Sequence, residues 1–183
     1  MNSLSTQDTA DIIESKKKKM RKRRDNLSII AEFFSVLLIC VLVLTFLFGI
    51  ASVKGNSMYP SLKNGDLVVY YRLENSISAG DVIAFKDSDG EQYVKRVAAV
   101  AGDTVDFENG VFYVNNSAQV DNVFFDTEPK DSSTVNFPYT VKENEVFVLG
   151  DHRTDSVDSR DRGGIELDMI SGKVIVCLRL SEI

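Results

Sequence analysis

The hydrophobic positions of this chain follow two different patterns, and the change between them falls near residue 53. From Phe33 to Ile50 the sequence FFSVLLICVLVLTFLFGI is predominantly apolar and carries no charge, and its neighbours extend the apolar run to 29–53. At 1.5 Å per helical residue, the uncharged part alone spans roughly 27 Å, close to the thickness of the hydrocarbon core of a bilayer. We therefore predict one transmembrane helix over residues 29–53.

A cleaved secretory signal is the alternative interpretation, since it also has a basic start and an apolar middle. Its apolar region is shorter, however, and ends in a small-residue cleavage site that residues 50–53 fit poorly. Eight basic residues between Lys16 and Arg24 precede the apolar run. Because positive charge stays on the cytoplasmic side, we predict a basic cytoplasmic tail over residues 1–28 and an extracytoplasmic domain over residues 54–183, attached to the cell membrane.

From residue 54 onward the apolar residues occur in short runs rich in β-branched and aromatic side chains, a pattern typical of strands. These runs begin at Leu67, Val82, Tyr93, Thr104, Val111, Glu145 and Lys173. Turn sequences such as NGD, AGD and DSDG separate them, and no segment shows a helical stripe of helix length. We predict a mostly β domain of two packed or partly closed sheets. Residues 104–114 should form a tight hairpin and residues 121–140 a longer exposed loop.

The formal net charge of −6 is distributed unevenly along the chain. Residues 1–28 carry eight basic and four acidic side chains, whereas the chain from Lys54 onward carries 13 basic and 22 acidic ones. An acidic outer domain repels phosphate backbones, which argues against nucleic acid as its partner. The basic tail has the composition of a nucleic-acid arm, but its position beside an apolar span favours a role in topology and attraction to the lipid bilayer.

Cysteine and histidine usage limits the chemistry further. Cys40 lies inside the apolar run and Cys177 lies near the C-terminus, so we expect no disulfide between them. His152 is the single histidine, so we expect no zinc site, and no motif predicts a cofactor.

A candidate nucleophile, Ser57, follows the apolar run within a few residues and needs a base to become reactive. The histidine of a triad could come only from His152, and several lysines are alternatives. Lys95 stands out among them because its surroundings, YVKRVAAV, are those of a strand that enters a core. At a reference pKa near 10.4, only about one lysine in a thousand is neutral near pH 7.4, a cost of roughly 4 kcal/mol. Desolvation lowers the pKa of a buried lysine by up to about 3 to 5 units, which would make Lys95 a base.

A third cluster is the sequence GDHRTDSVDSRDRGG from Gly150 to Gly164, which follows the run EVFVL. Its charged residues are Asp151, Arg153, Asp155, Asp158, Arg160, Asp161 and Arg162. One interpretation is a solvated loop whose surface ion pairs contribute little. The other is the wall of a site, in which carboxylates and guanidiniums pair in bidentate fashion and lock the loop against the sheet.

Four motifs occur in order after the apolar run: GNSMYPSL, GDVIAF, YVKRVAAVAGDTV and GDHRTDSVDSR. Together they resemble the conserved boxes of type I signal peptidases, and the short outer domain with one span is most similar to the Gram-positive bacterial members. The resemblance covers almost everything from Val53 to Ile183. It implies a domain of antiparallel β-sheet and a Ser-Lys serine endopeptidase that removes signal peptides from exported preproteins without a metal or a cofactor.

The resemblance also implies roles for individual residues. Ser57 matches the nucleophile, and Lys95 matches the general base. The supporting residues that it implies are Ser156, whose hydroxyl orients the lysine amine, the structural pair Asp158 and Arg160, the polar residues Asp151 and Arg153, and Met58 in the substrate cleft.

Three positions depart from the family pattern. Gly55 stands where some members place a serine that donates to the oxyanion, so the backbone N–H of Ser57 must serve this purpose, with a second donor that the sequence does not identify. His152 replaces a usual asparagine, which we interpret as a structural change. Ala101 replaces a usual proline and alters a turn.

The position of Ser57 suggests how the substrate is met. If the anchor ends at residue 53, the serine lies within roughly 13 Å of the membrane face, where the cleavage site of a signal peptide emerges. We expect small residues at the first and third positions before the cut, bound as an extended strand. Two alternatives remain: a related enzyme specialised for pilus assembly, and a non-catalytic tethered β domain that binds exported proteins.

Overall fold

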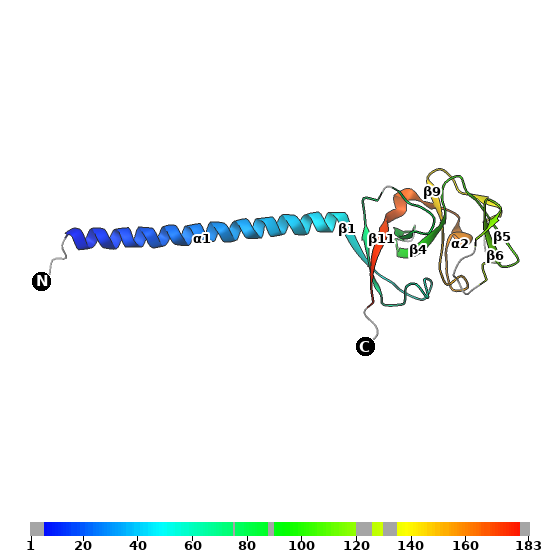
Figure 1. Ribbon diagram of the computed structural model, residues 1–183, viewed down its shortest axis with the longest axis horizontal. Helices are drawn as coiled ribbons and strands as arrows, with labels where there is room; N and C mark the ends of the chain where they lie inside the picture. Colours follow the sequence, from blue (N-terminus) through cyan, green and yellow to red (C-terminus); the bar gives the residue numbers. More distant parts are fainter. Residues whose placement is uncertain (1–5, 75, 88–89, 120–125, 130–134, 180–183) are drawn as a thin grey trace. The chain divides into compact units, whose positions relative to one another are not determined.

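The computed structural model describes residues 6–74, 76–87, 90–119, 126–129 and 135–179. The chain divides into two compact units, Met1–Thr45 and Phe46–Ile183. The first unit is helical, and the second is built from strands with two short helical turns (Figure 1). The predicted mostly β fold after one N-terminal apolar helix is therefore confirmed.

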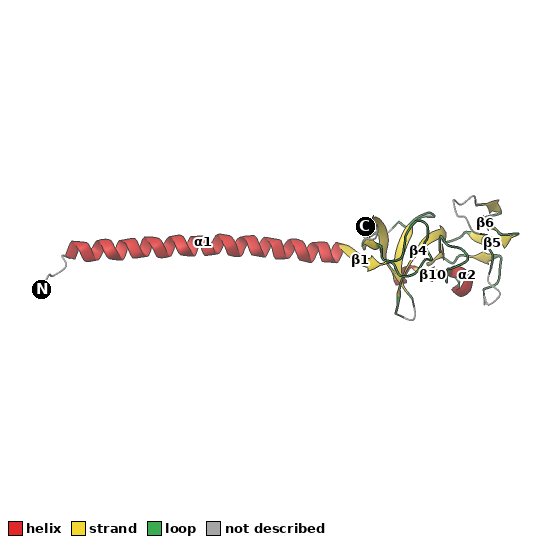
Figure 2. Cartoon of the chain, turned by 90° about the horizontal axis from the view of Figure 1, so that it is seen from below, coloured by secondary structure: helices red, strands yellow, loops and turns green. Residues whose placement is uncertain are grey.

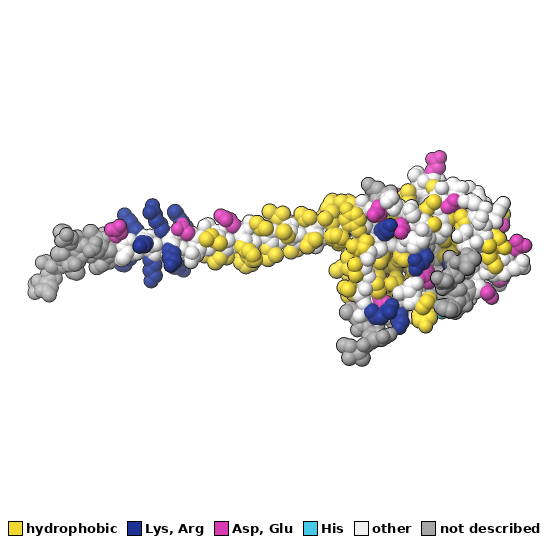
Figure 3. Space-filling view, in the orientation of Figure 1, with side chains coloured by type: hydrophobic (Ala, Val, Ile, Leu, Met, Phe, Trp, Pro, Cys, Tyr) yellow, Lys and Arg dark blue, Asp and Glu magenta, His cyan; other side chains and the backbone are white. Residues whose placement is uncertain are grey.

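The helix α1, Thr6–Leu47, begins well before the apolar run, so the basic segment is helical as well. Figure 3 shows a band of Lys and Arg side chains followed by an apolar stretch. The apolar side chains from Ile29 to Phe46 are exposed on every side of the helix. The segment Glu14–Leu47 is long and apolar enough to cross a membrane. A helix that is hydrophobic all round needs an apolar environment, which a bilayer supplies.

The predicted end of the helix at residue 53 is wrong. The helix ends at Leu47, and the strand β1, Phe48–Ser52, follows directly and pairs antiparallel with β2, Leu67–Tyr71. Gly49 permits this pairing because a Cβ at this position would collide with the ring of Tyr70. A local apolar run does not reveal such a change, since pairing with a later strand decides it.

The larger sheet has seven antiparallel strands in the order β1-β2-β11-β3-β4-β9-β10, and Figure 2 shows its strands in yellow. Beyond β1 and β2 its strands are β3 (Val82–Lys86), β4 (Gln92–Ala99), β9 (Glu145–Leu149), β10 (Ile165–Glu166) and β11 (Ile170–Leu178). Two short helical elements, α2 (Ser159–Arg162) and η1 (Leu167–Met169), lie between β9 and β11 in the sequence. All the predicted strands that fall in this sheet are present.

The smaller sheet has four strands in the order β7-β6-β5-β8. They are β5 (Thr104–Glu108), β6 (Val111–Val114), β7 (Ser117–Ala118) and β8 (Tyr139–Thr140). The predicted hairpin is confirmed, because β5 and β6 pair across Asn109 and Gly110, which both have positive φ. Half of the exposed loop predicted over 121–140 lies outside the described residues, and its last two residues form β8.

Three clusters of buried apolar side chains form the core of the β unit. The cluster that positions the site gathers side chains from β1, β2, β3 and β4, together with Met58 and Leu62 from the connection between β1 and β2. Met58 is fully buried. Burial of a side chain of this size contributes about 1.5 to 3 kcal/mol, so the two residues anchor this connection to the sheet.

Candidate active site

Ser57 lies on the connection between β1 and β2, residues 54–65, which we call the Ser57 loop. Two backbone hydrogen bonds close its base: the Val53 N–H donates to the Asp66 carbonyl at 2.8 Å, and the Gly65 N–H donates to the Val53 carbonyl at 2.9 Å. Within the loop, the Leu62 N–H donates to the Met58 carbonyl at 2.8 Å. These bonds satisfy backbone groups locally and give the loop a defined shape.

The polar loop, Gly150–Gly164, contacts the Ser57 loop directly. The His152 N–H donates to the Ser57 carbonyl at 3.0 Å. A Cβ at Gly150 would collide with the Ser156 side chain and would lie 2.5 Å from the Ser57 carbonyl oxygen. Glycine at this position therefore allows Ser57 and Ser156 to approach each other closely.

Lys95 lies on β4, where it pairs with Ile83 of β3, and only 2% of the residue is exposed. Together with Ser57 and Met58 it lines a pocket with a volume of about 130 Å³. Val53, Tyr93 and Val94 line the same pocket, together with the polar residues Ser52, Lys54, Glu91 and Gln92. Burial against apolar side chains disfavours the charged form of an amine. The structure therefore brings Ser57, Lys95 and Met58 to one pocket.

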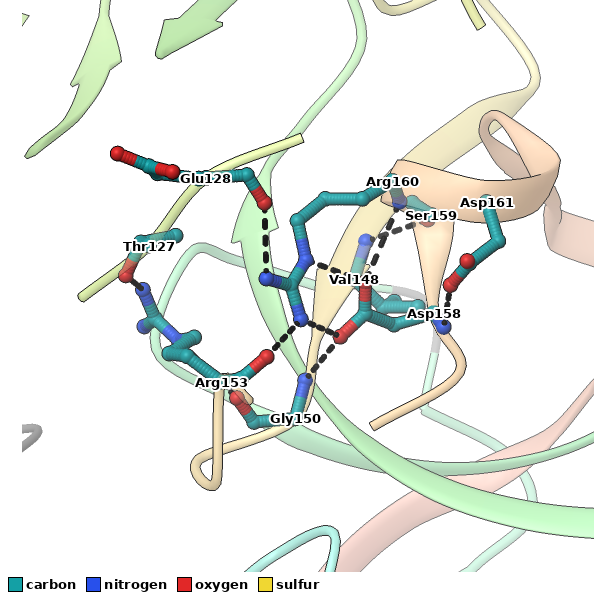
Figure 4. Close-up of polar contacts among 9 residues, drawn as sticks. All are labelled: Thr127, Glu128, Val148, Gly150, Arg153, Asp158, Ser159, Arg160 and Asp161. Carbon is teal, nitrogen blue, oxygen red and sulfur yellow. Dashed lines mark hydrogen bonds and ion pairs between the residues drawn. The ribbon is translucent and has the colours of Figure 1, made fainter. Parts of the chain in front are cut away.

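The most buried polar contacts surround the pair of Asp158 and Arg160 in the polar loop (Figure 4). Arg160 Nε donates to Asp158 Oδ1 and Nη2 donates to Oδ2, both at 2.9 Å. Arg160 Nη2 also donates to the Arg153 carbonyl at 2.6 Å, and Nη1 donates to the Glu128 carbonyl at 3.1 Å. The predicted bidentate pair is present, and it ties the polar loop to the segment that contains Glu128.

The carboxylate of Asp158 also organises its own loop. Burial opposes its ionisation, but the hydrogen bonds and charge of Arg160, with smaller contributions from the Gly150 N–H and the Ser156 hydroxyl, hold the pKa of Asp158 below its ordinary value. Asp158 caps the helix α2, and the Asp161 side chain accepts a hydrogen bond from its N–H at 3.0 Å. This capping box fixes the chain two residues after Ser156.

The polar residues that open the loop, Asp151 and Arg153, contact different parts of the β unit. Asp151 pairs with Arg96 of β4 at 2.8 and 2.7 Å, and Arg153 donates to the Thr127 hydroxyl at 2.8 Å. Arg96 follows Lys95 directly, so one strand supplies both the buried lysine and the partner that locks the polar loop. Arg96 Nη2 also donates to Ser61 Oγ in the Ser57 loop at 3.3 Å.

Sequence reasoning missed four residues of this arrangement: Arg96, Gly150, Thr127 and Ser159, whose hydroxyl accepts from the Val148 N–H at 2.9 Å. One signal for Arg96 was available. Neighbouring side chains of a strand point to opposite faces of the sheet. If Lys95 is buried on one face, Arg96 must lie on the other, where it needs acidic partners of its own.

The described part of the chain contains no group of three His, Cys, Asp or Glu side chains arranged to hold a metal ion. Cys40 and Cys177 are both free thiols. The groups in the pocket that can carry chemistry include the Ser57 hydroxyl and the amine of the buried Lys95.

Comparison with known proteins finds similarity to one family over most of the chain. The family described as signal peptidase, peptidase S26, matches residues 26–179. A signal peptidase I of Bacillus caldolyticus is 32% identical over 156 residues, which cover 78% of this chain and 85% of the relative. A signal peptidase IB of Staphylococcus aureus is 33% identical over 141 residues, 67% of this chain and 73% of the relative. Among solved structures, a signal peptidase I of Enterococcus faecalis aligns at 26% identity with a TM-score of 0.44, over 56% of this chain and 98% of its own.

Proposed function

This chain belongs to the signal peptidase family, peptidase S26, and on that premise we propose that it removes signal peptides from exported preproteins with a Ser57–Lys95 dyad. The observation that carries the proposal is that Ser57 and the buried Lys95 line one pocket. A serine hydroxyl is a weak nucleophile until a base takes its proton. A lysine that is shielded from water can be that base, because desolvation favours its neutral form.

The reaction proceeds in two halves. As Ser57 Oγ attacks the scissile carbonyl carbon, its proton passes to Lys95 Nζ, and the resulting ammonium then protonates the leaving amine. This step leaves the signal peptide esterified to Ser57. A water molecule then gives a proton to Lys95 and attacks the ester, which releases the signal peptide as an acid and returns the proton to Ser57 Oγ.

The supporting residues act on the geometry of this dyad. Gly150 allows the Ser156 hydroxyl to lie close to the Ser57 backbone, and Asp158 fixes the loop that carries Ser156. We assign Ser156 the role of orienting the Lys95 amine. The Ser57 backbone N–H serves as one oxyanion donor, because Gly55 has no side chain to contribute.

Substrate choice follows from the size of the pocket. Its volume of about 130 Å³ is well below the roughly 300 to 1,000 Å³ of pockets that hold drug-sized ligands, so it has room only for a small side chain. We propose that the residue before the cut is small, as is typical of secretory cleavage sites. A peptide with Ala at this position should be cleaved much faster than one with Leu, and equal rates would contradict this part of the proposal.

The membrane places enzyme and substrate together. We propose that α1 crosses the cell membrane with its basic segment, which holds Lys16 to Arg24, on the cytoplasmic side and the β unit outside. The helix ends ten residues before Ser57, and β1 begins directly after it. A folded strand therefore lies between the helix and the Ser57 loop in the sequence, whereas the sequence predicted an anchor that ends at residue 53. A signal peptide anchored in the same bilayer meets the site by diffusion in two dimensions.

The test uses the full chain in liposomes with a preprotein as substrate. Ser57→Ala and Lys95→Ala should each abolish processing, whereas Ser117→Ala on β7 and Lys86→Ala on β3 should process at the parental rate, since both residues are exposed. Thermal unfolding of all four variants shows whether the fold is intact. Processing by folded Ser57→Ala or Lys95→Ala protein would rule out the dyad. Parental protein that binds preprotein but never cleaves it would instead support the alternative of a non-catalytic β domain.

A further inference from the structure

The Ser57 loop is held at Ser61 by two arginines, one on β4 and one directly after β11. Arg96 donates to the Ser61 hydroxyl at 3.3 Å, and Arg179, which follows β11, donates to the Ser61 carbonyl at 3.4 Å. Each arginine also contacts an aspartate: Arg96 pairs with Asp151, and Arg179 Nη2 lies 3.4 Å from Asp66 Oδ2. The contact made by Arg96 belongs to the site described above, whereas the contact made by Arg179 has no part in it.

Asp66 is an unusual residue for the end of a loop, because it is fully buried. Its Oδ2 atom accepts from the Lys63 N–H at 2.9 Å, which closes the last turn of the Ser57 loop. Its Oδ1 atom is buried and has no hydrogen-bond partner in the described part of the chain. A buried carboxylate is costly unless hydrogen bonds and nearby positive charge compensate it, and the Lys63 N–H bond lowers the pKa of Asp66 most, ahead of Arg179. Arg179 is the cation that the structure places there.

We infer that Asp66 and Arg179 form a positioning pair that holds the Ser57 loop in its reactive geometry. The inference rests on the proposed function of Ser57. Arg179 joins the loop at two points, the Ser61 carbonyl and the Asp66 carboxylate, and links it to the last strand of the sheet. Asp66 lies at the base of the loop and Ser61 lies four residues after Ser57, so the pair constrains the half of the loop that follows the nucleophile.

The pair is suited to positioning because the loop is already anchored in the core. Met58 and Leu62 pack into the apolar cluster, so loss of Arg179 leaves the loop folded. Arg179 is itself 41% exposed, so its ion pair is screened by water and contributes little to global stability. A displacement of about 1 Å at a nucleophile can nevertheless cost up to about 100-fold in rate. The effect should therefore appear in catalysis and not in unfolding.

The experiment compares Arg179→Gln with Arg72→Gln in the full chain. Arg72 is a matched control, because it is also exposed and also donates to a backbone carbonyl, that of Phe48, at 3.2 Å. We expect Arg179→Gln to lower kcat for peptide cleavage by about tenfold, with KM and Tm close to parental values. Arg179→Lys, which restores the charge, should recover most of kcat, and Arg72→Gln should match the parent.

Two results in these measurements would overturn the inference. One is a parental kcat in folded Arg179→Gln protein; the other is a loss of kcat that follows a loss of Tm, because the pair would then act on stability alone. Ser57→Ala is measured in the same series. If Ser57→Ala is inactive and Arg179→Gln is fully active, only the positioning pair fails. If folded Ser57→Ala protein still cleaves, the proposed function fails as well.

Cys177 provides a second readout, because its Sγ atom lies 3.6 Å from Asp66 Oδ2. Burial raises the pKa of the Cys177 thiol, the charge of Asp66 raises it further, and Arg179 lowers it. In a Cys40→Ser background, the thiol pKa is measured from the pH dependence of alkylation. Asp66→Asn should lower this pKa and Arg179→Gln should raise it, whereas an unchanged pKa in both variants would show that the pair is not formed in solution.

Discussion

The Ser57 loop and the polar loop meet at Ser57, but they are held in different ways. The Ser57 loop is anchored by apolar side chains, Met58 and Leu62, and its arginine contacts are partly exposed. The polar loop is built around the ion pair of Asp158 and Arg160, which are both buried. An apolar anchor tolerates the loss of a polar contact, whereas a buried charge does not tolerate the loss of its partner. Loss of an arginine should therefore cost little stability in the Ser57 loop and much more in the polar loop.

The largest effect is expected from Arg160→Met in the polar loop. Removal of the guanidinium leaves the Asp158 carboxylate buried without its partner, which costs about 3 to 5 kcal/mol of the free energy of unfolding. Arg162→Met is the control in the same helix, because the Arg162 side chain is 40% exposed, although its partner Asp87 is largely buried. Its loss should cost under about 1 kcal/mol. Urea unfolding of both variants measures the difference.

The double variant Asp158→Asn with Arg160→Met tests whether the cost comes from the unpaired charge of Asp158. It removes the buried charge together with its partner, so it should be more stable than Arg160→Met alone. Equal unfolding free energies for Arg160→Met and Arg162→Met would show that the buried pair does not hold the polar loop, and the contrast between the loops would then fail.

The strands differ in whether the sequence alone could predict them. Runs rich in β-branched residues predict the longer strands, because such a run can be recognised within the strand itself. The strand β1 escaped prediction because FGIAS continues an apolar run and acquires its pattern only by pairing with β2. The strands β7, β8 and β10 have two residues each, too few to show a period.

The site divides in the same way. The burial of Lys95 could be predicted from its neighbours in YVKRVAAV. The ion pair of Asp158 with Arg160 could be predicted too, because its partners are only two positions apart in the sequence. Arg96 and Asp151 are 55 residues apart, and Arg179 and Asp66 are 113 residues apart. No local pattern predicts which of several arginines reaches which aspartate, because the strand order of the sheet decides it. For this reason the sequence suggested a locked polar loop but not its partner on β4.

A smaller effect on the free energy of unfolding is expected when the pH is lowered. The pKa of Asp158 lies below its ordinary value when the protein is folded: burial opposes ionisation, but Arg160 outweighs it. The stabilisation is therefore present above the unfolded pKa, about 3.9, and is lost as the pH falls through the lower folded pKa. The parent should lose stability steeply below about pH 4, as measured by the urea midpoint between pH 7 and pH 2.

Asp158→Asn isolates this contribution, because the pKa values of Asp66 and Glu145 are also lowered and add to the acid sensitivity of the parent. The variant should be less stable than the parent at neutral pH, and the gap should narrow below pH 4. Asp168→Asn, which changes an exposed residue of η1, should follow the parental curve throughout. A gap between Asp158→Asn and the parent that stays constant with pH would contradict the assignment.

The smallest effect is expected at Lys142, which pairs with Glu145 at 2.7 Å beyond both loops. Glu145 is mostly buried, as Asp158 is, so geometry alone would suggest a cost like that of Arg160→Met. Two features argue otherwise: the Lys142 side chain is 74% exposed, and the Tyr139 hydroxyl donates to Glu145 Oε2 at 2.7 Å and keeps the carboxylate satisfied. Lys142→Met should therefore cost at most about 1 kcal/mol in urea unfolding. A loss as large as that of Arg160→Met would mean that burial of the carboxylate, and not exposure of the cation, decides the cost of breaking a pair in this fold.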